Sequence, residues 1–563
     1  MSITLPAASS IRSRDSGVAP LGVFFDATGT TGSVTTRPFH ELHYRWNFGD
    51  GSSGNWSITG KSKNIAKGPM AAHIYESAGT FTWTLWVKDT TGTVESTSGQ
   101  ITVTSADSQF AGSKTYCFST GTDFTGAPGD CPPENKITTS SWTTIKSYLS
   151  ADRRLLLKRG DTWTGDSQAT LPTTGPGIFG AFGSGNKPII NISGEIYLFV
   201  FPSGYTPDWR LMDLKIKGSG SPNVQVAVAN GGTSAQNRSL CIRLDIEDCQ
   251  TSFGTSGGDY VAHEENFIVE CKSRNASGWH IYYCCSKSAF LGNDLATMVG
   301  NGAHLIRVWA AYKLVISFNS LDRGTGGMTT LKLHADPDFD TEYVIFSYNE
   351  VPVYDQTIDF RPQNSESNEK VKNGIIERNK FSATSITDNC VHISAREITV
   401  RNNLTDVSST QWLNGVVVDQ RGIEPAPNYV FVYNNTFYKG GTGGSETYGG
   451  RVSSGTSIYW RNNMCVFLAG GTTAQVINNI GDELIQSNNY LTTANDDDFV
   501  DAPNGDFRLV SGSSCKDGGY SVPVLNDYGE NSRPVNSTWD IGAYEYGGLN
   551  EDEQGMPVWL FRM

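Results

Sequence analysis

The sequence VISFNSL (Val315–Leu321) introduces a phrase that recurs over the next 170 or so residues: a few β-forming residues, then Asn, then a turn. The other copies are VIFSYNEV (Val344–Val351), GIIERNKF (Gly374–Phe381), ITVRNNL (Ile398–Leu404), VFVYNNTF (Val430–Phe437), IYWRNNM (Ile458–Met464) and IQSNNYL (Ile485–Leu491). The marking residues are Asn319, Asn349, Asn379, Asn403, Asn435, Asn463 and Asn489, with successive spacings of 30, 30, 24, 32, 28 and 26 residues. Short strands at such spacings, with no helical period between them, are typical of a solenoid of β-coils.

The variable spacing favours a parallel β-helix over a propeller, whose four-stranded blades need a nearly constant period of about 40 residues. Asn suits a tight corner between two strands because it tolerates a positive φ, so we expect the marking Asn residues to be left-handed. Stacked at a strand spacing of about 4.8 Å, their side-chain amides can also bond along the column. The alternative is a set of isolated hairpin turns, which would favour Asn-Gly instead.

Bulk composition places the chain among folded, turn-rich β proteins. Its residues are 38% hydrophobic, 11% aromatic and 18% charged, with 61 Gly. A length of 563 residues predicts two or more domains unless a repeat architecture accounts for it. A net charge of −14 and a pI near 5.1 argue against a nucleic-acid partner. They leave carbohydrate open, since a local basic groove can hold an anionic glycan on an acidic protein.

No apolar run approaches the roughly 20 residues of a membrane span, so we expect no membrane insertion. The N-terminal segment MSITLPAASSIRSRDSG lacks a basic stretch followed by an apolar one, so no signal peptide is expected. The ten cysteines show no CxxC pair and no metal spacing, and most fit as reduced core residues. Cys117 and Cys131 are the best disulfide candidates, because they would close a loop rich in Gly and Pro.

Two motifs identify the N-terminal unit: WNFGDG (Trp46–Gly51) and HIYESAGTFTWTLWVKD (His73–Asp89), the second with alternating Phe81, Trp83 and Leu85. The unit resembles a PKD domain, an immunoglobulin-like β-sandwich that serves as a spacer or weak binding module. Asn47 replaces the usual Asp, and an insertion from 52 to 72 lengthens the loop between the motifs. The resemblance gives His73 and Asp50 packing and turn roles rather than ligand roles.

Other phrases resemble bacterial and phage right-handed β-helix proteins: RRLLLKRGDTW (Arg153–Trp163) and FGSGNKPII (Phe182–Ile190) at the start, RPVNSTWDIGAYEY (Arg533–Tyr546) at the end. That likeness implies structural roles for Asp540, Gly542 and Tyr544. The expected fold is all-β: a PKD-like β-sandwich (1–106), a linker and N-terminal cap (107–150), a right-handed parallel β-helix (151–510), and a C-terminal cap and tail (511–563). The apolar end of the tail is expected either to dock on a partner subunit or to fray.

Residues at equal offsets from the marking Asn should stack in neighbouring coils and reveal an exposed site. An offset of 15 residues gives the polar column His304, His334, Asn364 and Asp388, and a different loop length would align Arg307 with His334 instead. His392, in DNCVHI, and Tyr283 are further candidates for substrate contact. In strands these polar side chains cannot all be buried cheaply, so we expect them to share an outer face.

The phrases around this column resemble β-helix lyases that act on alginate or chondroitin, although LKLHAD has Lys332 and His334 where that family has Thr and Arg. Elimination from a uronic acid needs a cation for the carboxylate, a base for the C5 proton and an acid for the leaving oxygen. Arg307 would be the cation, Lys332 or His334 the base, and His304 or Tyr283 the acid. A solvated polar stripe without chemistry is the alternative.

Hydrolysis would instead need two suitably spaced carboxylates. The candidates are Asp336, Asp338, Asp340, Asp388 and Asp419, and no doublet stands out. The run Asp336, Asp338, Asp340 resembles the start of a Ca²⁺ loop, but Thr341 and Ser347 occupy positions six and twelve, so it is not an EF-hand. No cofactor is required, and Ca²⁺ is the one metal left open.

The sequence therefore favours a phage tailspike-like protein, at a virion surface or outside the cell, that recognises a bacterial surface polysaccharide, with or without cleaving it. One alternative is a secreted bacterial polysaccharide lyase with a PKD accessory domain. Another is a structural or adhesive virion protein without an active site. The tailspike resemblance implies a homotrimer or contacts with other virion proteins.

Overall fold

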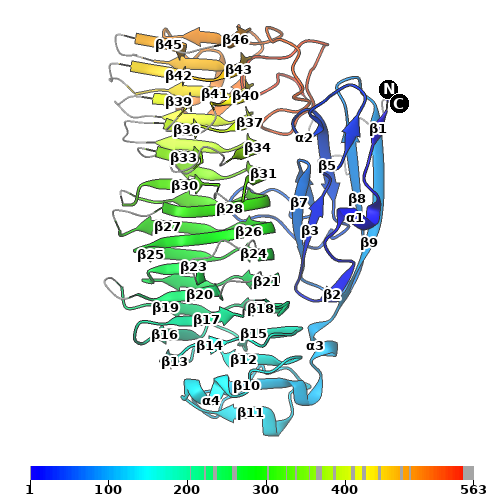
Figure 1. Ribbon diagram of the computed structural model, residues 1–563, viewed down its shortest axis with the longest axis vertical. Helices are drawn as coiled ribbons and strands as arrows, with labels where there is room; N and C mark the ends of the chain where they lie inside the picture. Colours follow the sequence, from blue (N-terminus) through cyan, green and yellow to red (C-terminus); the bar gives the residue numbers. More distant parts are fainter. Residues whose placement is uncertain are drawn as a thin grey trace.

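The computed structural model describes residues 2–548 except for fifteen short stretches. Those stretches are 203, 221–223, 232–236, 257–262, 301–303, 325, 336–338, 354–355, 363–369, 384–388, 408–412, 421–425, 442–445, 469–472 and 481–482, and residues 1 and 549–563 are likewise outside the description. The described chain is almost entirely β and forms two bodies side by side, a solenoid and an N-terminal β-sandwich (Figure 1).

The solenoid has three strands in each turn, and each strand pairs in parallel with the equivalent strand of the next turn. Leu331, for example, pairs with Ile358, which pairs with Val391. The three strand positions define three faces, here called A, B and C; A and B belong to one 25-stranded sheet, and C is a 13-stranded sheet. This arrangement confirms the predicted parallel β-helix.

Face A consists of β14 (Ala169–Thr170), β17 (Tyr197–Phe201), β20 (Val226–Gly231), β23 (Thr251–Ser256), the first parts of β26 (Trp279–Leu291) and β28 (His304–Ser317), β30 (Thr329–Leu333), β33 (Gln356–Phe360), β36 (Asn389–Ile393), β39 (Leu413–Val418), β42 (Glu446–Val452) and β45 (Thr473–Asn479). Face B consists of β10 (Thr115–Ser119), β12 (Arg154–Lys158), β15 (Gly177–Phe182), β18 (Trp209–Met212), β21 (Asn237–Ile242), β24 (His263–Val269), the second parts of β26 and β28, β31 (Thr341–Ser347), β34 (Val371–Glu377), β37 (Arg396–Arg401), β40 (Asn428–Tyr433), β43 (Thr456–Arg461) and β46 (Leu484–Ser487). Face C consists of β13 (Thr162–Gly165), β16 (Ile189–Ile192), β19 (Lys215–Lys217), β22 (Asp245–Glu247), β25 (Lys272–Ala276), β27 (Asp294–Met298), β29 (Ser320–Asp322), β32 (Glu350–Pro352), β35 (Lys380–Ala383), β38 (Leu404–Val407), β41 (Thr436–Lys439), β44 (Met464–Phe467) and β47 (Tyr490–Thr492).

The marking Asn residues form a hydrogen-bonded ladder at the corner between faces B and C. The side-chain amide of each donates to the side-chain oxygen of the next at 2.9–3.2 Å, from Asn319 to Asn489, and Asn293 adds one more rung. The stacking confirms the prediction, but the predicted positive φ belongs to the residue before each Asn, such as Phe318 (φ 64°) and Tyr348 (φ 55°). The left-handed residue makes the corner, and the following Asn can then point its amide between the turns.

The N-terminal β-sandwich confirms the second part of the predicted fold. Its strands are β1 (Ile3–Thr4), β2 (Ser16–Val18), β3 (Leu21–Asp26), β4 (Thr31–Gly32), β5 (His43–Asn47), β6 (Ile65–Lys67), β7 (Met70–Tyr75), β8 (Gly79–Lys88) and β9 (Val94–Thr104), with the short helices α1 (Ala8–Ile11) and α2 (Pro38–Glu41). The sheet β2-β9-β8-β5-β6 packs on the pair β3-β7 through Trp46, Trp83 and Phe25. His73 stacks on Phe48 at 4.6 Å, with its Nε2 3.1 Å from an Asp50 oxygen.

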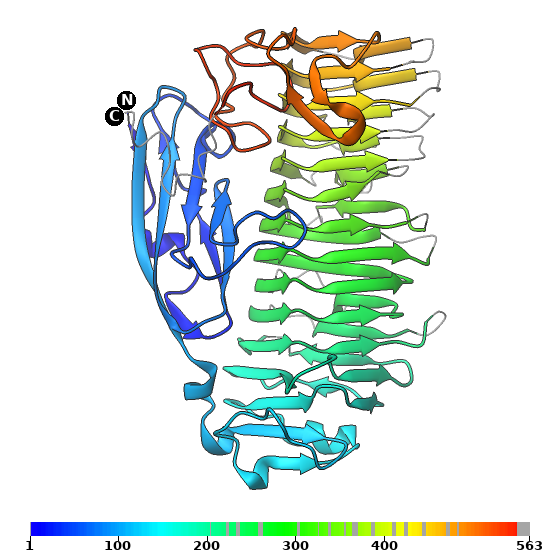
Figure 2. The same cartoon turned by 180° about the vertical axis from the view of Figure 1, so that it is seen from behind.

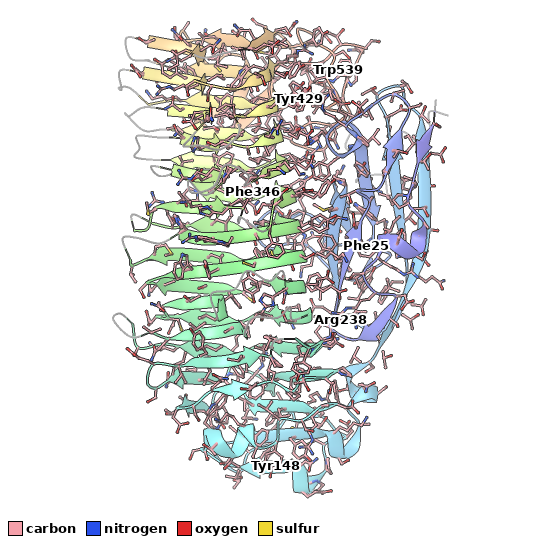
Figure 3. All side chains as sticks on the ribbon, viewed as in Figure 1. Phe25, Tyr148, Arg238, Phe346, Tyr429 and Trp539 are labelled. Atoms are coloured by element: carbon pink, nitrogen blue, oxygen red, sulfur yellow. The ribbon has the colours of Figure 1, made fainter. Side chains whose placement is uncertain are left out.

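The sandwich lies along face B of the solenoid rather than standing away from it (Figure 2). An apolar layer joins the two bodies, with Met70 and Ile74 on the sandwich and Phe267 and Ile345 on face B. Figure 3 shows side chains filling the space between them. Buried Arg14 adds ion pairs to Asp208 and Glu265, each at 2.7 Å. Face B is therefore covered over most of its height.

One loop of the sandwich inserts an aromatic ring into the solenoid corner. Trp56 stacks on Phe318 at a centroid distance of 5.2 Å and an angle of 12°, and Phe318 stacks in turn on Tyr348. Gly292 makes room for this ring, because a Cβ there would lie 2.6 Å from the indole, and its φ is 64°. The corner thus fixes the position of the sandwich.

Short helices and irregular segments complete the two ends of the solenoid. The linker holds α3 (Ala106–Gln109), the 3₁₀ turns Gly112–Lys114 and Pro133–Asn135, β11 (Lys136–Thr138) and α4 (Trp142–Lys146). The C-terminal segment holds β48 (Phe499–Asp501), a 3₁₀ turn (Ala502–Asn504) and β49 (Asp506–Leu509), which pack on the outside of face C beside Tyr438 and Met464. It then follows the B–C corner, where Asn402 and Asn434 donate to backbone oxygens of Asn526 and Asp540.

Candidate functional site

Face A is the outer face on which neither the sandwich nor the C-terminal segment packs in the described part of the chain. Face B carries the sandwich, and the upper part of face C carries the C-terminal segment. On the lower part of face C the charges pair with each other, with Lys215 and Lys217 at 3.0 and 3.3 Å from Glu247. On face A the side chains of Tyr282, Arg307, Lys332, Arg361 and Asp419 reach solvent, whereas Trp309, His334, Asp359 and His392 are at most 9% exposed, so the expected polar stripe is only partly exposed.

A polar column runs up the middle of face A across five turns. Strand register places Tyr282, Arg307, Lys332, Asp359 and His392 directly above one another. Their sequence neighbours point into the core, because side chains alternate along a strand. This alternation puts Tyr283, Val308, Leu333, Phe360 and Ile393 inside, each at most 1% exposed.

A second outer column lies beside the first, two positions further along the chain in each turn. It consists of Trp309, His334, Arg361, Ser394 and Asp419. The rings of Trp309 and His334 stack at a centroid distance of 5.2 Å. The Arg307 guanidinium lies 4.2 Å from the Trp309 ring centre and 5.8 Å from that of Tyr282. Cation and aromatic rings therefore form one continuous surface.

The two columns are joined by a chain of alternating charges. Arg361 Nε lies 2.8 Å from Asp359, whose other oxygen is 3.2 Å from His392 Nδ1. His392 Nε2 lies 2.5 Å from Asp419, which also accepts a hydrogen bond from Ser394 at 3.1 Å. This arrangement holds the upper part of the site rigidly.

The charge states of this chain follow from its contacts. Burial works to raise the pKa of Asp359, but the hydrogen bond from His392 and the charges of Arg361 and Lys332 lower it below its ordinary value. Burial likewise works to lower the pKa of His392, and the hydrogen bonds to Asp359 and Asp419 raise it. A protonated His392 between two carboxylates results.

His334 has the opposite environment. It is 2% exposed, and neither ring nitrogen has a hydrogen-bond partner among the described residues. Burial, followed by the charges of Lys332, Arg307 and Arg361, lowers the pKa of His334 to about 2. Burial and the first two of these cations also lower the pKa of His304 to about 3, and His304 Nδ1 contacts Thr329 Oγ1 at 2.6 Å. Both imidazoles are neutral at ordinary pH.

The structure brings five of the predicted site residues onto face A: Arg307, Lys332, His334, His304 and His392. The predicted column is wrong in register, because His304 pairs with Thr329 and Lys332 pairs with Arg307. The connection from face A to face B differs in length between turns, so an offset counted from the Asn ladder does not carry over.

Tyr283 corrects another expectation. Its side chain is 1% exposed and points into the core, and this burial raises the pKa of Tyr283 well above its ordinary value. Tyr282 takes the outer position instead. Asn364, Asp388, Asp336 and Asp338 lie outside the described residues.

Sequence reasoning missed Arg361, Asp359 and Trp309. A signal was present: the strand TIDF (Thr357–Phe360) has the same alternation as CVHI (Cys390–Ile393), which aligns Asp359 with His392. Trp309 had no such signal, because the register shifts beside it at a bulge in β26 and β28.

Comparison with known proteins identifies one part of the chain. Residues 12–104 match the PKD domain family. This match confirms the resemblance seen in the WNFGDG motif, and the PKD domain is the sandwich that covers face B. No curated protein matches the sequence.

Three solved β-helix structures are similar at low identity. The family 28 exopolygalacturonase of Yersinia enterocolitica is 9% identical over 87% of this chain and 98% of its own, with a TM-score of 0.31. Tailspike protein 3 of bacteriophage CBA120 is 11% identical over 66% of this chain and 61% of its own, with a TM-score of 0.33. The catalytic domain of a GH87 α-1,3-glucanase is 10% identical over 84% and 91%, with a TM-score of 0.33.

Two further findings concern ligands and membranes. Among the described residues, no group of three or more His, Cys, Asp or Glu side chains is arranged to hold a metal ion. Asp340, the described member of the acidic run, lies 3.8 Å from Lys372. In the same part of the chain, no helix has the length and apolar character to cross a membrane.

Proposed function

We propose that the chain recognises a bacterial surface polysaccharide along face A, and that this polysaccharide carries acidic groups. The observation that supports the proposal is the cluster of partly exposed Arg307, Lys332 and Arg361 beside the Tyr282 ring, on a chain with a net charge of −14. Acidic groups would pair with the cations, and sugar rings would stack on Tyr282.

A linear polymer suits this surface better than a small ligand does. The turns repeat at a strand spacing of about 4.8 Å, so equivalent outer positions form rows along the axis. A chain lying along face A would contact the middle column over several turns at once. Hydrogen bonds to charged groups contribute roughly 1.5 to 3 kcal/mol each, so a few such contacts suffice for recognition.

Cleavage by β-elimination is a second candidate, and the neutral His334 beside two cations favours it. Arg307 would neutralise the carboxylate of a uronic acid, and Lys332 or His334 would take the proton from C5. The electron pair would form the C4–C5 double bond as the C4–O bond breaks, and the departing oxygen would take its proton from water, because His304, the acid expected from the sequence, is neutral and buried. Hydrolysis is less well supported, because Asp359, the described carboxylate next to Asp419, is fully buried.

A panel of acidic and neutral bacterial polysaccharides tests both candidates. We expect binding to one or more acidic polymers, and unsaturated uronate products if elimination occurs. New reducing ends without unsaturation would point to hydrolysis through Asp419, and binding without products to an adhesin. Failure to bind any acidic polymer in the panel would contradict the proposal.

We also propose that the protein works at a virion surface or outside the cell, as the tailspike resemblance implies, and assembles as a homotrimer. Light scattering at several protein concentrations tests the oligomer. A mass of one chain, 61.1 kDa, at all of them would contradict the trimer.

A further inference from the structure

Two cysteines face each other where the solenoid begins. All ten cysteines are free and buried. Cys117, on β10, and Cys131, at the end of the following loop, are both buried in one apolar cluster. Cys131 also donates to the backbone oxygen of Thr115 at 3.6 Å.

We propose that Cys117 and Cys131 form a disulfide under oxidising conditions, which fastens the loop 118–130 across the first turn of the solenoid. This modification site is independent of the polysaccharide proposal. It makes the stability of the solenoid's first turn depend on the redox state of the surroundings.

The loop already lies in the position that the bond would fix. Lys158 on β12 contacts it twice, donating to the Thr125 oxygen at 2.7 Å and pairing with Asp123 at 3.1 Å. Phe124 packs parallel to Phe182 at a centroid distance of 6.2 Å. These contacts hold the loop against β12 and β15, on the side of the solenoid where Cys117 and Cys131 share their cluster.

The position gives the bond a mechanical role. On its outer side β10 pairs with β11, a strand of three residues, while on its inner side it pairs with β12. A solenoid opens most easily at its ends, because a terminal turn has a neighbour on one side only. A link between β10 and the loop would hold this end closed.

Other cysteines also lie close to one another, but inside the solenoid: the Cys271 thiol donates to the backbone oxygen of Cys241 at 3.6 Å, and both residues belong to the main core. Cys284 and Cys285 are adjacent in sequence, but they point to opposite sides of β26: Cys284 belongs to an outer cluster with Trp309, and Cys285 to the core. Cys390 and Cys465 lie in the core of separate turns. Cys117 and Cys131 differ from these in sharing a cluster outside the main core, at the end of the solenoid.

The reaction can proceed with a small disulfide such as oxidised glutathione. One protein thiolate attacks it and releases one small thiol, and the second protein thiolate then attacks the mixed disulfide and releases the other. Two protein thiols are oxidised, one small disulfide is reduced, and the two protons end on the released thiols. Burial raises the pKa of both cysteines, so exchange is slow and passes through opening of the loop.

The test uses the full chain, incubated with oxidised glutathione or with a reductant, then denatured, alkylated and mapped by mass spectrometry. We expect the oxidised protein to be two hydrogen atoms lighter, to show two fewer alkylated cysteines, and to yield a peptide linking Cys117 to Cys131. The control Cys284→Ser keeps this link, and Cys131→Ser loses it. No link after prolonged oxidation, or a link between other cysteines, would overturn the proposal.

A second measurement covers the case in which a Ser variant fails to fold. Limited proteolysis of the unsubstituted protein compares cleavage within 118–130 before and after oxidation. We expect cleavage to slow in the oxidised sample and to recover on reduction. Equal rates in the two states would overturn the fastening role.

Discussion

Replacing Asn403 by Ala in the middle of the ladder should open the corner locally. The side chain is 3% exposed and takes part in four hydrogen bonds. It accepts from the backbone and side-chain amides of Asn379, both at 3.0 Å, and donates to Ile376 at 2.9 Å and Asn435 at 3.0 Å. The substitution removes all four and leaves the backbone N–H of Asn379 buried without its acceptor.

The expected cost follows from these contacts. A buried donor left without a partner costs about 1 to 3 kcal/mol, and each of the other three bonds contributes about 1 kcal/mol, which gives roughly 4 to 6 kcal/mol. At about 1.4 kcal/mol for each factor of ten, amide exchange at Asn379 should accelerate by roughly three to four orders of magnitude.

Hydrogen exchange is the suitable assay, because unfolding of a chain with two bodies need not be two-state. The peptide spanning Asn379 reports the local opening. Asn489→Ala is the matched control: this residue ends the ladder, is only half buried and takes part in three bonds, so water can replace them at lower cost. Unchanged exchange at Asn379, or an equal effect in the control, would refute the role of the ladder.

Three further predictions concern docking and pH. Gly292→Ala should weaken the packing of the PKD domain on face B, because the new Cβ would lie 2.6 Å from the Trp56 ring and a φ of 64° costs a non-glycine residue about 1 to 2 kcal/mol. Faster proteolysis of the linker would check this prediction, and unchanged cleavage would contradict it. Arg14→Ala should cost about 1.5 to 3 kcal/mol, because it removes charged hydrogen bonds to Asp208 and Glu265, while Arg210 and Arg238 stay paired with these carboxylates; a lower midpoint of thermal unfolding checks this, and an unchanged midpoint would contradict it. The raised pKa of His392 means that its protonated form stabilises the fold fully below its ordinary value of 6.5 and loses this effect as pH rises through the raised pKa. His392→Gln should therefore lower the thermal midpoint more at pH 6 than at pH 9, and an equal or reversed difference would contradict the charge assignment.

The repeat could be predicted from the sequence because its physical cause is local. A left-handed corner and a stackable amide must recur in every turn, so the phrase around Asn403 repeats with recognisable chemistry. The docking of the PKD domain on face B was not readable. It depends on Trp56, Arg14 and Gly292 meeting residues hundreds of positions away, and no local pattern marks such a contact.

The site was readable only in part. Arg307, Lys332 and His334 could be recognised because they are polar residues that alternate with apolar ones in strands, and this alternation predicts an outer face for them. Their mutual register was lost, since loop lengths between faces vary by several residues. Tyr283 shows the same limit at the scale of one residue: a shift of one position exchanges the core for the surface, and the bulge at β26 hides which of Tyr282 and Tyr283 faces out.

The most direct test of polysaccharide recognition on face A is the dissociation constant of an acidic polysaccharide that the chain binds, measured for the unsubstituted protein and for Lys332→Ala. Loss of one charge-assisted hydrogen bond of about 1.5 to 3 kcal/mol predicts binding weaker by roughly 10- to 150-fold. Lys217→Ala, which removes a half-exposed lysine from face C, should leave the constant unchanged. Equal affinity in Lys332→Ala, or weakening in the face C variant alone, would contradict the account.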